Sequence, residues 1–224
     1  MIDKVAESPK AAVADIRSGS TILVGGFGEA GSPANLLHAL LEQGATDLTL
    51  VSNNVGYNDE GMAALIARGR VRKMVCTFPN YAGGVAFKKR YLAGEIELEL
   101  VPQGTLVERM RAGGAGLGGF FTPTGAETEL SAGKETRLID GVMQVLEQPL
   151  KGDYALIRGK LADRWGNLTY WRAQRNFNPI MAMAATITIA EVDEIVPLGA
   201  IDPDVVITPG PFVHRVTACP VRRS

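Results

Sequence analysis

Cysteine, histidine and long apolar runs are all scarce in this chain of 224 residues. No segment holds roughly 18 uncharged apolar residues, so we expect no membrane-spanning helix. The first residues, Met-Ile-Asp-Lys-Val-Ala-Glu, lack the basic-then-apolar order of a signal peptide. The two cysteines, Cys76 and Cys219, are too far apart for a C-x-x-C pair. Their scarcity in a chain of this size favours reduced thiols and a cytoplasmic location.

Several kinds of site are excluded by residues that the sequence does not contain. The two histidines, His38 and His214, are widely separated and have no suitable cysteine partner, so we expect no metal site. No G-x-S-x-G motif indicates a serine hydrolase, and no G-K-[ST] follows the glycines, as a P-loop would need. The formal net charge of −1 gives no general attraction to nucleic acid or to anionic membranes.

What the sequence does contain is an alternation of short apolar runs with segments of helical spacing. Such alternation predicts βαβ units, and hence an α/β fold with an open, mainly parallel sheet. Residues 134–150 alternate polar and apolar positions, which predicts a smaller antiparallel β layer. The length fits a single domain over residues 1–224, with the tail from about residue 217 as a candidate for disorder. Strands are expected at 22–24, 47–52, 71–77, 95–101, 153–160 and 186–192, and helices at 3–18, 33–43, 59–68, 81–93, 105–111 and 179–185.

A glycine-rich turn follows the first expected strand, over Gly25, Gly26, Phe27, Gly28, Glu29, Ala30, Gly31 and Ser32. Ser32 suits the N-cap of the next helix and Pro33 its first position. The backbone N–H groups and positive helix end would then make this turn an anion site. Gly26-x-Gly28-x-x-Gly31 also has dinucleotide-binding spacing, but the second strand ends in Ser52-Asn53-Asn54 and not in a ribose-binding acid.

A second glycine-dense stretch runs from residue 112 to 125 and contains Phe120-Phe121-Thr122-Pro123-Thr124. Paired aromatic residues are not typical of a flexible linker. We therefore expect the backbone here to lie close to a ligand or to a neighbouring segment. Thr105 and Glu108, just before it, have the spacing of a capping box with Thr105 as the N-cap.

Neutral amides recur where the expected strands end, at Asn53, Asn54 and Gln103. The carboxyl ends of strands form the ligand crevice of an open α/β sheet, and amide donors meeting there suit a developing oxyanion. The alternative role for each amide is turn formation. The chain offers no convincing nucleophile beside them, so the pattern is that of half an active site.

Several motifs together resemble the alpha subunit of family I coenzyme A transferases. They are Val24-Gly25-Gly26-Phe27-Gly28, Ser52-Asn53-Asn54, Val101-Pro102-Gln103-Gly104, the two ends of the second glycine stretch, and Arg175-Asn176-Phe177-Asn178. The resemblance implies a CoA-transferase fold and an obligate beta subunit, in a heterodimer or an α2β2 assembly. It also implies that a glutamate of the beta subunit carries the CoA as a glutamyl thioester. The turn Gly25 to Ser32 would bind CoA, while Asn53, Asn54 and Gln103 would support the oxyanion. A CoA thioester would be a substrate, with no permanently bound cofactor.

Within this family, residues 133–137, 163–170 and 179–185 are most similar to members that act on 3-oxoadipate. The resemblance therefore implies transfer of CoA from succinyl-CoA to 3-oxoadipate. The sequence departs from that pattern at Trp171 and over residues 80–89, so acetoacetate or another short 3-oxoacid is the nearest alternative acceptor. A ligand-sensing regulatory module is an alternative of a different class, but no helix-turn-helix segment or basic face accompanies it.

Overall fold

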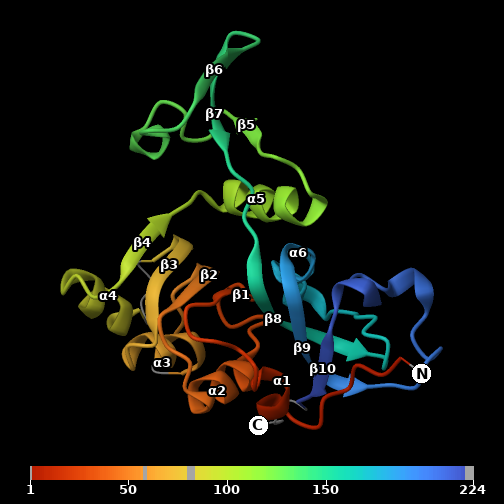
Figure 1. The fold of residues 1–224 in the computed structure, drawn as a ribbon. Coiled ribbons are helices and arrows are strands. Elements are labelled where there is room, and N and C mark those ends of the chain that lie inside the picture. Colours follow the sequence, from red (N-terminus) through yellow and green to blue (C-terminus); the bar gives the residue numbers. More distant parts are fainter. Residues whose placement is uncertain (1, 58–59, 80–83, 220–224) are drawn as a thin grey trace.

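The computed structural model describes residues 2–57, 60–79 and 84–219 and has an open α/β fold (Figure 1). Its main sheet has seven strands in the order β10-β9-β8-β1-β2-β3-β4, and neighbouring strands pair in parallel. The strands are β1 (Thr21–Val24), β2 (Leu48–Asn54), β3 (Val71–Phe78), β4 (Glu97–Leu100), β8 (Gly152–Ala162), β9 (Ala185–Ile195) and β10 (Arg215–Ala218). The predicted open, mainly parallel sheet is confirmed.

Helices cover both faces of this sheet because side chains alternate along each strand. In β1, Ile22 and Val24 belong to one apolar cluster, whereas Leu23 belongs to the other. The first cluster lies under α1 (Pro9–Val13), α2 (Ala34–Gln43), α3 (Gly61–Ala67) and α4 (Val85–Leu92). The second lies under α5 (Gln103–Ala115) and α6 (Asn178–Ala184). None of the helices in the described part of the chain combines the length and apolar character of a membrane span.

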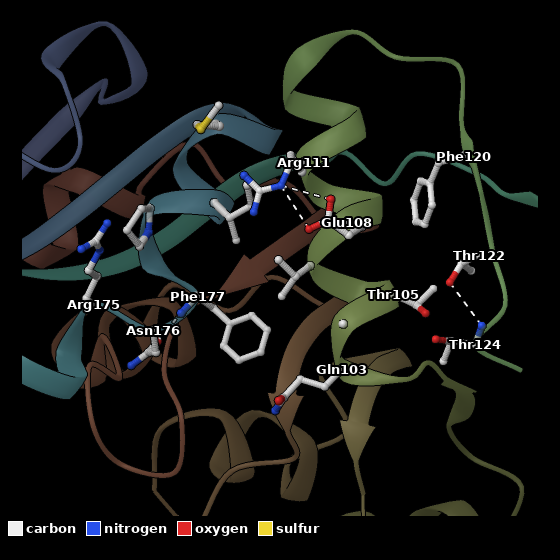
Figure 2. A pocket seen from close by; sticks show the side chains of 15 residues that line it. Gln103, Thr105, Glu108, Arg111, Phe120, Thr122, Thr124, Arg175, Asn176 and Phe177 are labelled. Carbon is white, nitrogen blue, oxygen red and sulfur yellow. Dashed lines mark hydrogen bonds and ion pairs between the residues drawn. The ribbon is translucent and has the colours of Figure 1, made fainter.

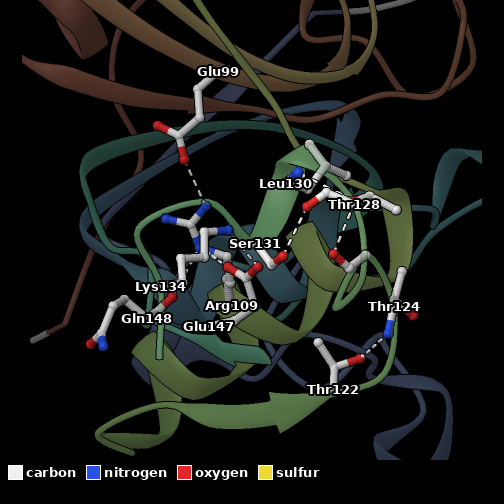
Figure 3. Close-up of polar contacts among 11 residues, drawn as sticks. Glu99, Arg109, Thr122, Thr124, Thr128, Leu130, Ser131, Lys134, Glu147 and Gln148 are labelled. Atoms are coloured by element: carbon white, nitrogen blue, oxygen red, sulfur yellow. Dashed lines mark hydrogen bonds and ion pairs between the residues drawn. The ribbon is translucent and has the colours of Figure 1, made fainter. Parts of the chain in front are cut away.

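The predicted antiparallel layer is a three-stranded sheet that projects from the body beyond α5 (Figure 1). Its strands β5 (Phe120–Thr122), β6 (Thr136–Ile139) and β7 (Val142–Glu147) lie in the order β5-β7-β6. Arg109 of α5 joins this layer to the main sheet, as Figure 3 shows. It pairs with Glu99 of β4 at 2.7 Å and donates to the Gln148 carbonyl at 2.9 Å. Lys134 in turn pairs with the buried Glu147 at 2.6 Å.

The two ends of the chain differ from the sequence prediction. A helix over 3–18 is wrong, because α1 is only Pro9–Val13 and Val5 forms a parallel bridge with Val216. The tail from about residue 217 is a candidate for disorder by sequence, whereas in the structure Thr217 and Cys219 are buried and β10 extends to Ala218. Pairing with β9 orders this segment; residues 220–224 lie outside the described part, as do the first residues of the helices predicted at 59–68 and 81–93.

Helix α5 begins earlier and ends later than predicted. It starts at Gln103, so Thr105 lies inside the helix and the predicted capping box is wrong. It also includes the first glycines of the second glycine-dense stretch. A Cβ on Gly113 would lie 2.2 Å from the Leu150 carbonyl oxygen, and one on Gly114 would lie 2.8 Å from that of Met183. Close approach to a neighbouring segment, one of the two predicted alternatives, is therefore confirmed here.

Candidate active site

The glycine-rich turn after β1 lies at the topological switch point of the main sheet, where the strand order changes direction. From β1 the chain builds β2, β3 and β4 towards one edge, whereas β8, β9 and β10 lie on the other side. Ligands of open α/β sheets bind outside the carboxyl ends of the strands at such a point. Gly26, Gly28 and Gly31 have φ values of 122°, 59° and 72°, a region that residues with a side chain rarely adopt.

Two asparagines hold this turn by hydrogen bonds. Asn176 lies just before α6, and Asn178 is the first residue of α6. Asn176 Oδ1 accepts from the Gly26 N–H at 3.2 Å, and Asn176 Nδ2 donates to the Ala30 carbonyl at 2.8 Å. Asn178 Nδ2 donates to the Gly31 carbonyl at 3.1 Å. Both asparagines belong to the motif Arg175-Asn176-Phe177-Asn178, but the sequence alone predicted no role for either of them. Their fit to the turn depends on glycine, because a Cβ on Gly25 would lie 1.8 Å from Asn178 Oδ1.

The N-terminus of α2 is capped by a carboxylate from a distant strand. Glu191 of β9 is fully buried, and its carboxylate accepts from the Leu36 N–H at 2.9 Å and from Asn35 Nδ2 at 3.2 Å. Pro33 occupies the N-cap position without a side-chain cap bond, so the prediction of Ser32 as the N-cap is wrong. The anion at this helix end is therefore a side chain of the protein itself.

Glu191 is paired within the interior of the molecule. Its carboxylate contacts the guanidinium of Arg158, which also contacts Asp193 at 2.5 Å. Burial raises the pKa of Glu191, while the Leu36 N–H and the positive charge of Arg158 act to lower it. Arg158 is also linked to the glycine-rich turn through Asn178, because the Arg158 backbone N–H donates to Asn178 Oδ1 at 3.0 Å.

The predicted amides do come together beside the turn. Asn53 Oδ1 accepts from Gln103 Nε2 at 2.7 Å and from the Thr77 hydroxyl at 2.8 Å. Since Oδ1 takes both bonds, the Nδ2 donor of Asn53 takes part in neither. Thr77 was missed by sequence reasoning, although it ends the third predicted strand. Asn54 Oδ1 accepts from the Gly56 N–H at 2.9 Å, which is the turn-forming role.

These residues line a pocket of about 400 Å³, which we name the amide pocket. Its described lining carries amide, hydroxyl and aromatic groups but no carboxylate or thiolate. The nearby thiol of Cys76 is buried in the core, and burial raises its pKa to about 12. The described residues that line the pocket are Phe27, Gly28, Asn53, Asn54, Thr77, Phe78 and Gln103.

A smaller hollow of about 50 Å³ lies against another side of the turn. Glu29 and Glu60 both line it, and burial together with the charge of Glu60 raises the pKa of Glu29. Two carboxylates in so small a space disfavour a phosphate group there. Within the described ranges, no three side chains of the His, Cys, Asp or Glu type gather closely enough to hold a metal ion.

A larger cavity of about 780 Å³ lies beside α5, between α6 and the strand β5, and we name it the α5 cavity (Figure 2). Gln103 lines both this cavity and the amide pocket. On its wall, Arg111 pairs with Glu108 at 3.1 Å. Arg175, Asn176 and Phe177 line it from the segment before α6, and of these three the Phe177 ring lies nearest α5 in Figure 2.

Comparison with known sequences identifies the family. A model described as coenzyme A transferase matches residues 6–218. The chain is 57% identical over 218 residues to the A-type subunit of 3-oxoadipate CoA-transferase from Pseudomonas putida, covering 97% of this chain and 94% of the relative. It is 48% identical over 200 residues to the alpha subunit of acetate CoA-transferase from Escherichia coli K12, covering 89% of this chain and 90% of the relative.

Solved structures agree on the fold. An acyl-CoA transferase of Escherichia coli O157:H7 superposes with a TM-score of 0.83 at 20% identity, covering 97% of this chain and 47% of that one. Glutaconate coenzyme A-transferase of Acidaminococcus fermentans gives 0.81 at 24% identity, covering 97% of this chain and 76% of that one. This chain therefore spans about half the length of the acyl-CoA transferase chain from Escherichia coli O157:H7. Its fold, its motifs and its relatives all agree: the chain belongs to the coenzyme A transferase family, as a subunit of the alpha type.

Proposed function

We propose that this chain is the alpha subunit of an enzyme that transfers CoA from succinyl-CoA to 3-oxoadipate. The choice of acceptor is supported by the order of identities among the relatives. Subunits named for 3-oxoadipate are 57% and 53% identical to this chain. A subunit from Bacillus subtilis with the name succinyl-CoA:3-ketoacid coenzyme A transferase, described as probable, is 47% identical.

The observation that carries the proposal is a pocket with oriented amide donors and no nucleophile among its described lining residues. A partner polypeptide of the beta type would complete it by placing a glutamate against Asn53. The relatives are named as subunits, and this chain spans only 47% of the Escherichia coli acyl-CoA transferase chain. Both facts support a second polypeptide.

In the proposed reaction the partner's glutamate attacks the thioester carbonyl of succinyl-CoA and displaces CoA as a thiolate. The resulting anhydride is then opened by the CoA thiolate at the glutamyl carbonyl, which releases succinate and leaves a glutamyl-CoA thioester. The carboxylate of 3-oxoadipate attacks that thioester and displaces the CoA thiolate, which gives a second anhydride. The thiolate then attacks the 3-oxoadipyl carbonyl of this anhydride, which forms 3-oxoadipyl-CoA and releases the glutamate. Covalent carriage splits one hard exchange into easier steps.

Each addition in this sequence places negative charge on a carbonyl oxygen. The Nδ2 group of Asn53 is suited to receive it, because Thr77 and Gln103 hold the opposite end of its amide. A donor fixed in advance stabilises such a charge without reorganising. Gly25 to Ser32 would contact CoA on the side of Phe27 and Gly28, which line the amide pocket, and away from the hollow that contains Glu29 and Glu60.

The test is to purify this chain alone and together with the beta subunit expected in the adjacent reading frame. The pair should form 3-oxoadipyl-CoA from succinyl-CoA, and the chain alone should not. Intact mass spectrometry of the pair after addition of succinyl-CoA should show the partner chain heavier by CoA less one water. Equal activity from this chain alone would contradict the proposal, and preference for acetoacetate over 3-oxoadipate would select the alternative acceptor.

A further inference from the structure

The tip of the glycine-rich turn, from Phe27 to Ala30, is closed on itself. The Phe27 N–H donates to the Ala30 carbonyl at 3.0 Å, and the Ala30 N–H donates to the Phe27 carbonyl at 3.2 Å. Gly26 and Gly31 flank this tip with φ values of 122° and 72°. Glycine populates both signs of φ readily, so the tip is a small closed unit between two flexible joints.

One side chain in the described part of the chain hydrogen-bonds to both ends of this tip. Asn176 Oδ1 accepts from the Gly26 N–H at 3.2 Å, just before the tip begins, and Asn176 Nδ2 donates to the Ala30 carbonyl at 2.8 Å, where it ends. Asn178 contacts the turn at Gly31, beyond the tip. Asn176 is therefore the side chain that ties the tip to the body of the molecule.

The amide of Asn176 is itself fixed from its other side. Its Nδ2 also donates to the Ala173 carbonyl at 2.6 Å, and its Oδ1 also accepts from the Phe177 N–H at 2.6 Å. Both hydrogens and the oxygen thus have partners, and turning the amide over would set donor against donor and acceptor against acceptor. The Phe177 ring is buried and lies between Asn176 and α5 in Figure 2. The amide is therefore oriented before any ligand arrives.

Two residues of the tip form part of the amide pocket. Phe27 and Gly28 line it, and the pocket also contains Asn53. The Phe27 ring is 54% exposed, so packing of this ring alone does not hold the tip in place. The orientation of the tip decides where this wall of the pocket lies relative to the Asn53 amide.

We propose that Asn176 is a positioning residue of the transfer reaction, which holds the tip in the one orientation that accepts a CoA thioester. This inference rests on the proposed function, because it takes the amide pocket to be the place where the thioester reacts. Without Asn176 the tip would populate several orientations, and a ligand that binds only one of them would bind more weakly in proportion to the fraction lost. Once bound, the ligand selects the competent orientation, so the reaction within the complex keeps its usual rate.

The experiment measures the two half-reactions of the complete αβ enzyme separately. In Asn176→Ala, KM for succinyl-CoA in formation of the glutamyl-CoA thioester should rise about 10- to 100-fold, as expected if the competent orientation falls to about 1–10% of the free enzyme. The kcat of that step should change less than about threefold, because the bound complex is unaltered. KM for 3-oxoadipate in the second half-reaction should also change less than about threefold, since CoA is then held covalently and organises the tip.

Asn176→Asp separates the hydrogen bond from the volume of the side chain. It keeps an acceptor for the Gly26 N–H but replaces the donor with an oxygen that faces the Ala30 carbonyl. KM for succinyl-CoA should rise about as much as in Asn176→Ala, although the side chain has nearly the same size. An unchanged KM in this variant would contradict the positioning role.

The matched control is Asn167→Ala, which removes another amide that bridges two segments. Asn167 Oδ1 accepts from the Gly210 N–H at 2.9 Å, and its Nδ2 donates to Asp163 at 2.7 Å. It is not among the described residues that line the amide pocket or the α5 cavity. This variant should lower the thermal unfolding temperature at least as much as Asn176→Ala and leave KM for succinyl-CoA unchanged.

Hydrogen exchange of the turn gives a measurement that needs no activity. The Gly26 N–H loses its acceptor in Asn176→Ala, so it should exchange faster in the free αβ enzyme than in wild type, and saturating CoA should slow it again. Exchange that is equally slow in both free enzymes would overturn the inference.

Three kinetic results would also overturn it. They are an unchanged KM for succinyl-CoA in Asn176→Ala, a loss in kcat alone together with lower stability, which a merely structural role would give, and an equal rise of KM in Asn167→Ala. Failure of the proposed function is a separate result. The wild-type pair would then form no glutamyl-CoA thioester from succinyl-CoA, whereas exchange at Gly26 in the free enzyme would still respond to Asn176→Ala.

Discussion

The carboxylate of Glu191 accepts a hydrogen bond from the backbone N–H of Leu36 at 2.9 Å, across 155 positions in the sequence. This contact joins the middle of β9 to the first turn of α2, immediately after the glycine-rich turn. The same carboxylate is paired with Arg158, whose backbone N–H reaches Asn178. One buried ion pair therefore fixes both the start of α2 and the segment that holds the turn.

Replacing Glu191 by alanine should lower the free energy of unfolding by about 3 kcal/mol, because Arg158 would be left buried with only part of its charge compensated. Asp193, at 2.5 Å from Arg158, retains some of that compensation. Urea unfolding of the purified chain measures the change. Glu194→Ala on the same strand is exposed and should stay within about 0.5 kcal/mol of wild type. Equal free energies of unfolding for the two variants would show that the ion pair of Glu191 and Arg158 does not stabilise the fold.

Gly31→Ala should disrupt the turn by a clash as well as by backbone strain. Gly31 has a φ of 72°, and an added Cβ would lie 2.5 Å from the Gln174 carbonyl oxygen and 2.9 Å from Asn176 Nδ2. Gly133→Ala is the matched control, since its φ is 75° and nothing lies within 4 Å of the new Cβ.

Backbone strain alone should lower the free energy of unfolding of each variant by about 1–2 kcal/mol. In Gly31→Ala the clash should lower it by about 1–3 kcal/mol more. Thermal unfolding of both variants gives the comparison, and transferase activity of the αβ enzyme should fall in Gly31→Ala alone. Similar stabilities would show that the asparagines can move aside without cost.

Asn53→Ala should reduce kcat of the αβ enzyme about 100- to 1,000-fold, the range measured when one oxyanion donor is removed elsewhere. Thr77→Val should have a smaller effect of about tenfold, because it removes one of the two hydrogen bonds that orient the Asn53 amide. Steady-state kinetics with succinyl-CoA should show both losses in kcat, with KM nearly unchanged. A change confined to KM would assign Asn53 to substrate binding and not to the oxyanion.

Local patterns were enough to predict much of the fold and part of the site. The parallel sheet followed from alternating apolar runs and helical segments. Asn53 and Gln103 could be expected to lie near each other, because the carboxyl ends of parallel strands meet at one edge of a sheet. The 2.7 Å hydrogen bond between them is the direct consequence.

Contacts between distant parts of the chain were not predictable from such patterns. Ser32 is the best N-cap by residue type, but the buried Glu191 supplies the acceptor for α2. No local signal indicates that Val5 pairs with Val216 and orders the end of the chain. The same holds for Asn176, whose hydrogen bonds to the glycine-rich turn cross about 150 residues. Only the packing of the whole molecule determines these partners.

The acid sensitivity of the chain should depend in part on Glu99 (Figure 3). Burial acts to raise the pKa of Glu99, but hydrogen bonds and charges from Arg109 and Lys73 outweigh it and hold the pKa below its usual value. A carboxyl group whose pKa is lower in the folded state stabilises the fold above its unfolded pKa, about 4.3 for Glu. That contribution is lost as the pH falls through the folded pKa.

Glu99→Gln should therefore lower the free energy of unfolding at pH 7 by less than about 1 kcal/mol, since the pair is partly exposed. Below about pH 4.3 the difference from wild type should shrink, because the wild-type carboxylate is then being protonated as well. Urea unfolding of wild type and variant from pH 7 to pH 3 measures this difference at each pH. Glu194→Gln is the control for removing an exposed charge. A difference that stays constant across this range would mean that Glu99 stabilises the junction of α5 and β4 by packing, because only a contribution from its charge can titrate away.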